Sequence, residues 1–277
     1  MIPPELKEIQ EEILNILFQS DVKLTAREYI KEIKSRFSLS FSEAKSILQD
    51  LIDHEELSYQ YLYGSTYVEK SFLKPVRISD HFILKPPWYN ESPTTNDIEI
   101  MIEPGISFGS GQHPTTRLCL NAIDFCFFEN KGIPFHPERR CTGADIGTGS
   151  GVLAMAMCLA GLSSCMAYEI DPVSICEAHK NAGLNNLTER IKVIEGSIKD
   201  SGNSFSMICA NLRYPTLVSL SEIIYSGLKE NGIAVLSGFR EWEKDLVFNV
   251  YADKGVDLVW QKDDKNWSAF VLVKKMC

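Results

Sequence analysis

The chain of 277 residues is expected to be an α/β protein: a doubly wound, mostly parallel, seven-stranded sheet with a small N-terminal α+β domain. Three observations predict this. From about Ile98 onward, short apolar runs alternate with helical stretches, which is typical of a parallel sheet covered on both faces. A glycine-rich turn joins one strand candidate to the next helix. The first 74 residues carry a different pattern, three helices followed by a hairpin.

The composition is that of a globular protein, with 44% hydrophobic and 23% charged residues. No apolar run approaches the roughly 20 residues that span a bilayer, so we expect no membrane partner. The N-terminus is amphipathic with early acids, so we do not expect it to be a secretory signal. Eight cysteines without a C-x-x-C pair then indicate reduced thiols and a cytoplasmic protein. Five scattered histidines without a His/Cys cluster predict no metal site.

Residues 1–74 are predicted to form a winged-helix-like domain for substrate or partner recognition. Thr25 with Glu28, and Ser40 with Glu43, match capping boxes at two helix starts. Aromatic residues alternate around Gly64, as in a hairpin. The third helix ends in acidic residues that would repel phosphate, and the whole chain has a net charge of −9, so direct nucleic-acid binding is not expected. The helical patterns cover Glu5–Gln19, Thr25–Phe37 and Ser40–His54.

Residues 75–97 are expected to be a linker and edge segment, because their second half is rich in Pro, Asn, Ser and Thr. Residues 98–277 are expected to form the main domain. Its strand candidates are Ile98–Ile102, Thr142–Ile146, Cys165–Ile170, Ile191–Glu195, Met207–Ala210, Ala234–Ser237 and Ala269–Lys274. Its helix candidates are Thr116–Phe128, Gly151–Ala160, Pro172–Asn185, Thr216–Leu228 and Glu241–Lys254.

The stretch "DIGTGSG", from Asp145 to Gly151, lies between a strand and an Ala-rich helix. Glycines at such a turn let the backbone approach a ligand at the helix N-terminus. The spacing is G-x-G-x-G, whereas dinucleotide sites favour G-x-G-x-x-G, which leaves room for a pyrophosphate. A carboxylate at Asp145 would repel pyrophosphate, but it can accept hydrogen bonds, directly or through water, from a cationic amino-acid group.

The next strand ends at Glu169, 18 residues after Gly151. An acid at this position accepts hydrogen bonds from the ribose hydroxyls of a nucleoside. Asp171 fits better as the N-cap of the helix that begins at Pro172. The alternative is that Glu169 and Asp171 are simply solvated acids at a strand end.

Asn211 follows a later apolar strand and offers one acceptor and two donors beside the same edge of the sheet. It could hold an incoming amine with its lone pair aimed at an electrophilic carbon. The alternative is that it serves a turn before the next helix.

A further segment, "EPGISFGSGQHPTTRLCL", surrounds Phe108 with glycines and continues into a His-Pro pair and two threonines. Together with "DIGTGSGVLAMA", "YEIDPVSICEAHKNAGLNN", "CANLRYPTLVSL" and the ending "NWSAFVLVKK", it resembles the PrmA family of S-adenosylmethionine-dependent methyltransferases that modify ribosomal protein L11. The first four pieces lie between about residues 98 and 238. The segment around Phe108 is the most specific, because generic methyltransferases do not carry it.

The resemblance implies a class I methyltransferase, a Rossmann-like fold, with S-adenosyl-L-methionine as cofactor. Phe108 and Gly109 would cover the cofactor, while Thr115 or Thr116 contacts its methionine portion. His113 is left with two interpretations, a site residue or a residue that only fixes the turn into the helix.

The resemblance also implies that Gly147 and Gly149 approach the methionine portion and that Glu169 holds the ribose. Asn211 would face the methyl group as the catalytic residue, by orienting the acceptor and not as a base. Ser197 stands where many class I enzymes have an acid for the adenine amino group, so adenine would be held by backbone groups and packing.

The family normally has a ferredoxin-like recognition domain at its N-terminus, which residues 1–74 do not resemble. Arg213 and Tyr214 bring a charge and an aromatic ring to the acceptor side, and their part in catalysis is left open. The leading interpretation is a protein N-methyltransferase that acts on lysine or α-amino groups, with a ribosomal protein as a candidate substrate. The alternatives are a methyltransferase for another protein, a small molecule or a nucleic acid, and a non-catalytic nucleoside-binding module.

Overall fold

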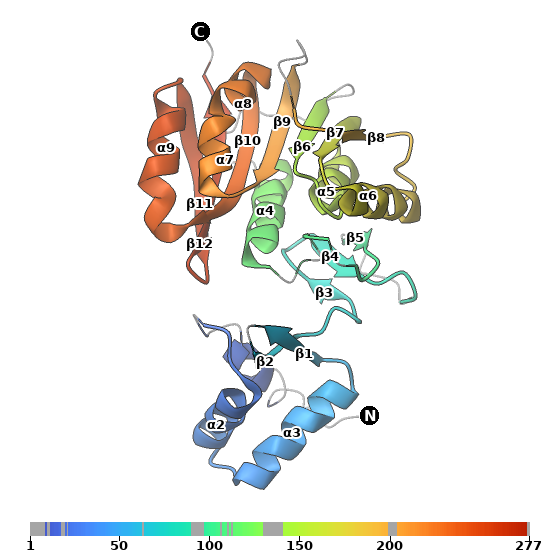
Figure 1. Ribbon diagram of the computed structural model, residues 1–277, viewed down its shortest axis with the longest axis vertical. Coiled ribbons are helices and arrows are strands. Elements are labelled where there is room, and N and C mark those ends of the chain that lie inside the picture. Colours follow the sequence, from blue (N-terminus) through green and yellow to red (C-terminus); the bar gives the residue numbers. More distant parts are fainter. Residues whose placement is uncertain are drawn as a thin grey trace. The chain divides into compact units, whose positions relative to one another are not determined.

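The computed structural model describes residues 9, 12–17, 20, 22–62, 64–89, 97–105, 107–109, 111, 113–129, 141–198 and 204–275. The chain divides into two compact units, Met1–Lys74 and Pro75–Cys277, whose elements are labelled in Figure 1. Among the described residues, no helix is both long enough and apolar enough to cross a membrane.

The first unit consists of helices packed on a two-stranded hairpin. Both predicted capping boxes are confirmed, since Thr25 and Ser40 each accept the N–H of the glutamate three residues later, whose side chain accepts the cap's own N–H. Residues 12–17 of the first predicted helix are helical. The buried Tyr29 donates its hydroxyl to the Ile13 carbonyl at 2.7 Å, which ties that helix to the core. The elements are α2 (Ala26–Phe37), α3 (Phe41–Asp53), β1 (Leu57–Leu62) and β2 (Ser65–Lys70).

The second unit is built on the predicted seven-stranded sheet, in the order β11-β12-β10-β9-β6-β7-β8. Strands β8, β7, β6, β9 and β10 are parallel, and β12 runs antiparallel to both β10 and β11. The strands are β6 (Thr142–Ile146), β7 (Ser164–Glu169), β8 (Ile191–Glu195), β9 (Phe205–Asn211), β10 (Leu228–Arg240), β11 (Val256–Asp264) and β12 (Trp267–Lys274).

Helices cover both faces of this sheet, as a doubly wound fold requires. Packing contacts group α4, α5 and α6 on one face and α7, α8 and α9 on the other (Figure 1). A π-helical turn, Phe125–Glu129, continues α4, and a 3₁₀ turn, Glu241–Glu243, precedes α9. The helices are α4 (Pro114–Asp124), α5 (Val152–Ala160), α6 (Pro172–Leu184), α7 (Tyr214–Ser219), α8 (Ser221–Gly227) and α9 (Lys244–Ala252).

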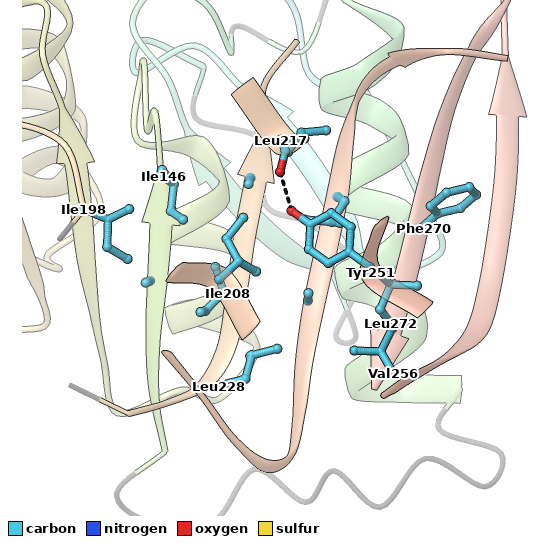
Figure 2. Close-up of a cluster of buried hydrophobic side chains, with 14 of the residues drawn as sticks. Ile146, Ile198, Ile208, Leu217, Leu228, Tyr251, Val256, Phe270 and Leu272 are labelled. Carbon is cyan, nitrogen blue, oxygen red and sulfur yellow. Dashed lines mark hydrogen bonds between the residues drawn. The ribbon is translucent and has the colours of Figure 1, made fainter. Parts of the chain in front are cut away.

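Figure 2 shows the apolar core between the sheet and the second group of helices. Tyr251 of α9 is buried there and donates its hydroxyl to the Leu217 carbonyl of α7 at 2.8 Å. Burial raises the pKa of this phenol above its ordinary range, so the hydroxyl remains a donor. Each fully buried large apolar side chain contributes about 1.5–3 kcal/mol. This core keeps the carboxyl ends of β9 and β10 in a fixed position.

Two features of the sheets were not given by the sequence. The strand predicted at Ile98–Ile102 is β5 (Ile98–Met101), and it lies outside the large sheet, in a three-stranded sheet with β3 (Val76–Arg77) and β4 (Phe82–Lys85). The expected linker thus contains two strands; its residues 90–96 lie outside the described part of the chain. The seventh strand of the large sheet is β11, an edge strand whose residues are mostly exposed and which was not among the strand candidates.

Asp124, the last residue of α4, connects this helix to the small sheet. Its buried carboxylate accepts hydrogen bonds from the Ser79 hydroxyl and from both the backbone N–H and Nδ1 of His81, the latter two at 2.9 Å. These hydrogen bonds tie the end of α4 to the turn between β3 and β4.

Candidate active site

The predicted glycine loop lies at the carboxyl end of β6, between β9 and β7. The N–H groups of Gly147 and Thr148 donate to the Tyr168 carbonyl of β7 at 2.9 and 3.0 Å. Gly151 is the N-cap of α5 and supplies no capping side chain. The loop thus brings the N-terminus of a buried helix to the sheet edge, which is the usual ligand position in open α/β folds.

Asp145 is fully buried at the end of β6. Its Oδ2 accepts hydrogen bonds from the Thr148 hydroxyl at 2.5 Å and from the Ala154 N–H at 3.1 Å. Burial raises the pKa of this carboxyl to about 7; the two hydrogen bonds oppose the shift and the charge of Glu169 adds to it. Its other oxygen, Oδ1, is buried without a partner among the described residues.

Glu169 ends β7 and turns its carboxylate onto the glycine loop. One oxygen accepts the N–H of Gly149 at 2.9 Å, and the other accepts those of Ile170 and Asp171 at 2.8 and 3.1 Å. Asp171 caps α6 as predicted, by accepting the N–H groups of Val173 and Ser174. Its bond from the Ser174 hydroxyl is the largest cause that lowers the pKa of Asp171. The two acids therefore have separate tasks, and Glu169 is held in one orientation beside the loop.

The segment around Phe108 lies directly against the glycine loop. The Phe108 carbonyl accepts the Ser150 N–H at 2.9 Å. Gly149 has a φ of +55°, and a Cβ there would lie 2.4 Å from that carbonyl oxygen. A Cβ on Gly109 would lie 2.5 Å from the Ser150 hydroxyl. The glycines are needed because two backbone segments meet here without room for a side chain.

His113 is the N-cap of α4. Its Nδ1 accepts hydrogen bonds from the Thr115 hydroxyl at 2.8 Å and from the Thr115 N–H at 3.3 Å. Its ring also contacts the rings of Phe108 and Trp267, with centroids 5.0 and 4.9 Å apart. Both interpretations of His113 therefore describe part of its surroundings: it fixes the turn into the helix, and its ring lies at the site.

Asn211 ends β9 next to the glycine loop. Its Cα pairs with that of Ser237 in β10, and a Cβ on Gly147 would lie 2.6 Å from the side chain of Leu212. The Asn211 Oδ1 is buried, and no described residue is its hydrogen-bond partner. Arg213 is the N-cap of α7. Asn211 therefore also lies in a turn before a helix, as the alternative interpretation of this residue expects.

Five buried side-chain oxygen atoms have no hydrogen-bond partner within the part of the chain that the structure describes, and all five belong to these segments. Buried polar groups are normally paired, and each orphan costs about 1–3 kcal/mol. Their concentration at one edge of the sheet indicates a site for a polar ligand. They are Ser107 Oγ, Thr116 Oγ1, Asp145 Oδ1, Ser150 Oγ and Asn211 Oδ1.

Two asparagines, one in α6 and one at its C-cap, support the site and were not predicted. Asn181 donates to the Ser150 carbonyl at 2.9 Å and accepts the Glu103 N–H at 3.2 Å. Asn185 exchanges hydrogen bonds with both the N–H and the carbonyl of Met101, at 2.8 and 2.7 Å. Their spacing of four residues on a helix, within "KNAGLNN", was the available signal.

The fold and the site together define a class I methyltransferase. From β6 onward the strands lie in the order 3-2-1-4-5-7-6, with the glycine loop after the first strand, the acid after the second and the asparagine after the fourth. The family model described as "Ribosomal protein L11 methyltransferase (PrmA)" matches residues 16–275, and the chain belongs to this family. The family and fold class expected from the sequence are confirmed.

Individual proteins similar to this chain carry the name of the same family. The chain is 31% identical over 250 residues to a ribosomal protein L11 methyltransferase of Fusobacterium nucleatum, covering 88% of this chain and 75% of the relative. It is 30% identical over 203 residues to one of Geotalea uraniireducens, covering 72% of this chain and 64% of the relative. A crystal structure of the ribosomal protein L11 methylase from Lactobacillus delbrueckii subsp. bulgaricus matches with a TM-score of 0.63 at 27% identity, over 73% of this chain and 100% of that chain.

Proposed function

We propose that the chain is an S-adenosylmethionine-dependent protein N-methyltransferase, with a lysine or α-amino group of a protein as acceptor. Ribosomal protein L11 is the first candidate acceptor, because the relatives are named for it. The observation that carries the proposal is the set of unpartnered buried oxygen atoms around the glycine loop, beside the fixed Glu169 carboxylate.

These atoms fit S-adenosylmethionine, which carries an ammonium group, a carboxylate and ribose hydroxyls. In this proposal Asp145 Oδ1 accepts hydrogen bonds from the ammonium group, directly or through water, and Thr116 Oγ1 can donate to the carboxylate. Glu169 Oε2, which accepts only the Gly149 N–H, keeps a lone pair for a ribose hydroxyl. Gly147 and Gly149 leave the room that the methionine portion needs.

Two further features bear on the nucleoside. The Ile170 side chain next to Glu169 is 73% exposed and is proposed to pack against the purine base. Ser197 is exposed, two residues after the end of β8. It stands where many class I enzymes have an acid for the adenine amino group, and it offers only a hydroxyl there. Phe108, which is 49% exposed, is proposed to lie over the cofactor with Gly109.

When bound, the cofactor supplies a methyl group on a positively charged sulfur, and transfer is an in-line displacement. The chain's task is then to bring a neutral amine close to that carbon. We propose that the free Oδ1 of Asn211 accepts a hydrogen bond from the amine and so aims its lone pair. Burial of the acceptor lowers the pKa of its ammonium form, so a dedicated base is not required.

Titration calorimetry with S-adenosylmethionine and its demethylated product tests the cofactor. Radiolabelled methyl transfer to purified ribosomal protein L11, and in parallel to a whole lysate, tests the acceptor. Glu169→Gln should weaken cofactor binding by about tenfold or more, because an amide accepts at one atom only. Glu230→Gln, an exposed acid at the opposite edge of the sheet, is the matched control. Absence of binding heat with both compounds would overturn the proposal; binding without label in any protein would leave a non-catalytic module.

A further inference from the structure

A guanidinium stacked on tryptophan lies at the same sheet edge as Asn211. Arg240 ends β10 and pairs with Trp267, the first residue of the antiparallel β12. Trp242 follows in the 3₁₀ turn before α9. We call Arg240, Trp242 and Trp267 the Arg240 cluster. None of the three was singled out from the sequence.

The geometry of the cluster fixes the guanidinium and leaves its donors available. The Arg240 Cζ lies 3.7 Å from the centroid of the Trp267 ring and 5.6 Å from that of Trp242. Cation–π stacking holds the plane of an arginine while its N–H groups point outward from the ring edge. Among the described residues, no carboxylate or carbonyl accepts a hydrogen bond from this guanidinium. A charged group whose plane is held by aromatic rings and whose N–H groups meet no acceptor in the described part of the chain is available to a ligand.

A chain of ring contacts joins the cluster to the glycine loop. Trp267 meets His113 edge to face at a centroid distance of 4.9 Å, and His113 meets Phe108 at 5.0 Å. The Phe108 carbonyl in turn accepts the Ser150 N–H. The Arg240 cluster therefore continues the same site and is no separate surface patch.

The order of the strands decides which end of the site the cluster serves. Glu169, proposed to hold the ribose, ends β7, two strands from β9 on one side of Asn211. Arg240 ends β10, the neighbour of β9 on the other side. The nucleoside and Arg240 thus flank Asn211 from opposite directions, which places the arginine where the acceptor must enter.

We propose that Arg240 recognises a carboxylate of the acceptor protein close to the amine that is methylated. This rests on the proposed function, because it assigns the acceptor side of the same site. A planar guanidinium binds a carboxylate through two parallel N–H···O bonds, and Trp242, 70% exposed, gives an apolar wall beside it. The net charge of −9 favours a protein carboxylate over a nucleic-acid phosphate.

The carboxylate can come from an Asp or Glu side chain or from a chain terminus, and peptides separate the two sources. The probes are three lysine peptides: one with a glutamate beside the lysine and an amidated end, one with a glutamine there and a free C-terminus, and one with glutamine and an amidated end. With the wild type, we expect kcat/KM at least about tenfold higher for one of the carboxylate peptides than for the uncharged one. Arg240→Met should bring this ratio close to one, and Arg240→Lys should keep part of it.

Lys274→Met is the matched control. Lys274 also stacks on an aromatic ring, 4.4 Å from that of Tyr225, but at the opposite edge of the sheet. This variant should keep the wild-type peptide ratio, and thermal unfolding of all variants checks that they fold.

Three outcomes would overturn the inference: a peptide ratio that Arg240→Met leaves unchanged, a wild type that prefers the uncharged peptide, and a larger loss in cofactor affinity than in peptide kcat/KM. Stronger competition by RNA than by the glutamate peptide, abolished in Arg240→Met, would assign the arginine to phosphate and also refute it. If the wild type binds the cofactor and methylates protein while the ratio stays at one, only this inference fails. If it neither binds nor methylates, the proposed function itself fails.

Discussion

Replacing Gly149 with alanine tests whether the glycine loop and the Phe108 segment must touch for the cofactor to bind. At a φ of +55°, an added Cβ costs about 1 kcal/mol or more in backbone strain. The Cβ would also lie 2.4 Å from the Phe108 carbonyl oxygen, well inside van der Waals contact. That carbonyl must move, so the hydrogen bond that it accepts from the Ser150 N–H at 2.9 Å is lost.

The two costs should appear in different measurements. The strain lowers the free energy of unfolding by about 1 kcal/mol whether or not a ligand is present. In the free protein the displaced segment also loses a hydrogen bond and its packing on the loop, so the free energy of unfolding falls further. Returning the segment to its place above the cofactor, against the added Cβ, then costs about 2 kcal/mol of binding free energy. Since 1.4 kcal/mol corresponds to a factor of ten in Kd, Gly149→Ala should weaken cofactor binding by about 30-fold.

Titration calorimetry with S-adenosylhomocysteine measures the affinity, and urea unfolding measures the stability. Gly255→Ala is the control, because Gly255 also has a positive φ, +92°, but its nearest neighbour is the Tyr225 hydroxyl at an ordinary 3.6 Å. The control should lose only the stability that backbone strain costs, and it should bind normally. Wild-type affinity in Gly149→Ala, or an equal loss of affinity in Gly255→Ala, would refute the reasoning.

Three other predictions concern turnover, pH and the first unit. Asn211→Ala should lower turnover by about 100-fold with little change in cofactor Kd, since orientation and not binding is lost; equal losses in both would contradict the assigned role. Burial raises the pKa of Asp145 to about 7 from an unfolded value near 4. Between these values the native state keeps a proton that the unfolded state has lost, so the free energy of unfolding should fall with rising pH, by at most about 1.4 kcal/mol per unit. Asp145→Asn should flatten that decline in urea titrations across pH, and an unaltered slope would disprove it. Thr25→Ala or Ser40→Ala should each cost about 1 kcal/mol of stability, measured by urea unfolding, because an N-cap is lost; wild-type midpoints would argue against it.

Much of the central sheet was predictable because its strands are buried on both faces and read as apolar runs. The glycine loop, Glu169 and Asn211 were found because they follow such runs directly, and the structure brings them together at one edge. The two capping boxes were equally predictable, because each depends on two residues that are three positions apart in the sequence.

The features that were missed depend on contacts between distant parts of the chain. Alternation in Ile98–Ile102 indicated a strand but not which sheet it joins. Strand β11 lies at the edge of the sheet, where only β12 pairs with it, and its short apolar run at Leu258–Trp260 is followed by polar residues. Arg240 and Trp267 are 27 positions apart and meet only through the pairing of β10 with β12. Sequence spacing alone gives no sign of such a cluster.

One buried amide sets the distance between two walls of the site. The Asn181 side chain accepts from Glu103, which precedes the Phe108 segment, and donates to Ser150 in the glycine loop. The clearance between the two is therefore established during folding, before any ligand arrives. A homologue with another residue in place of Asn181 would need a second substitution, near Glu103 or in the glycine loop, to keep the same distance between the two segments.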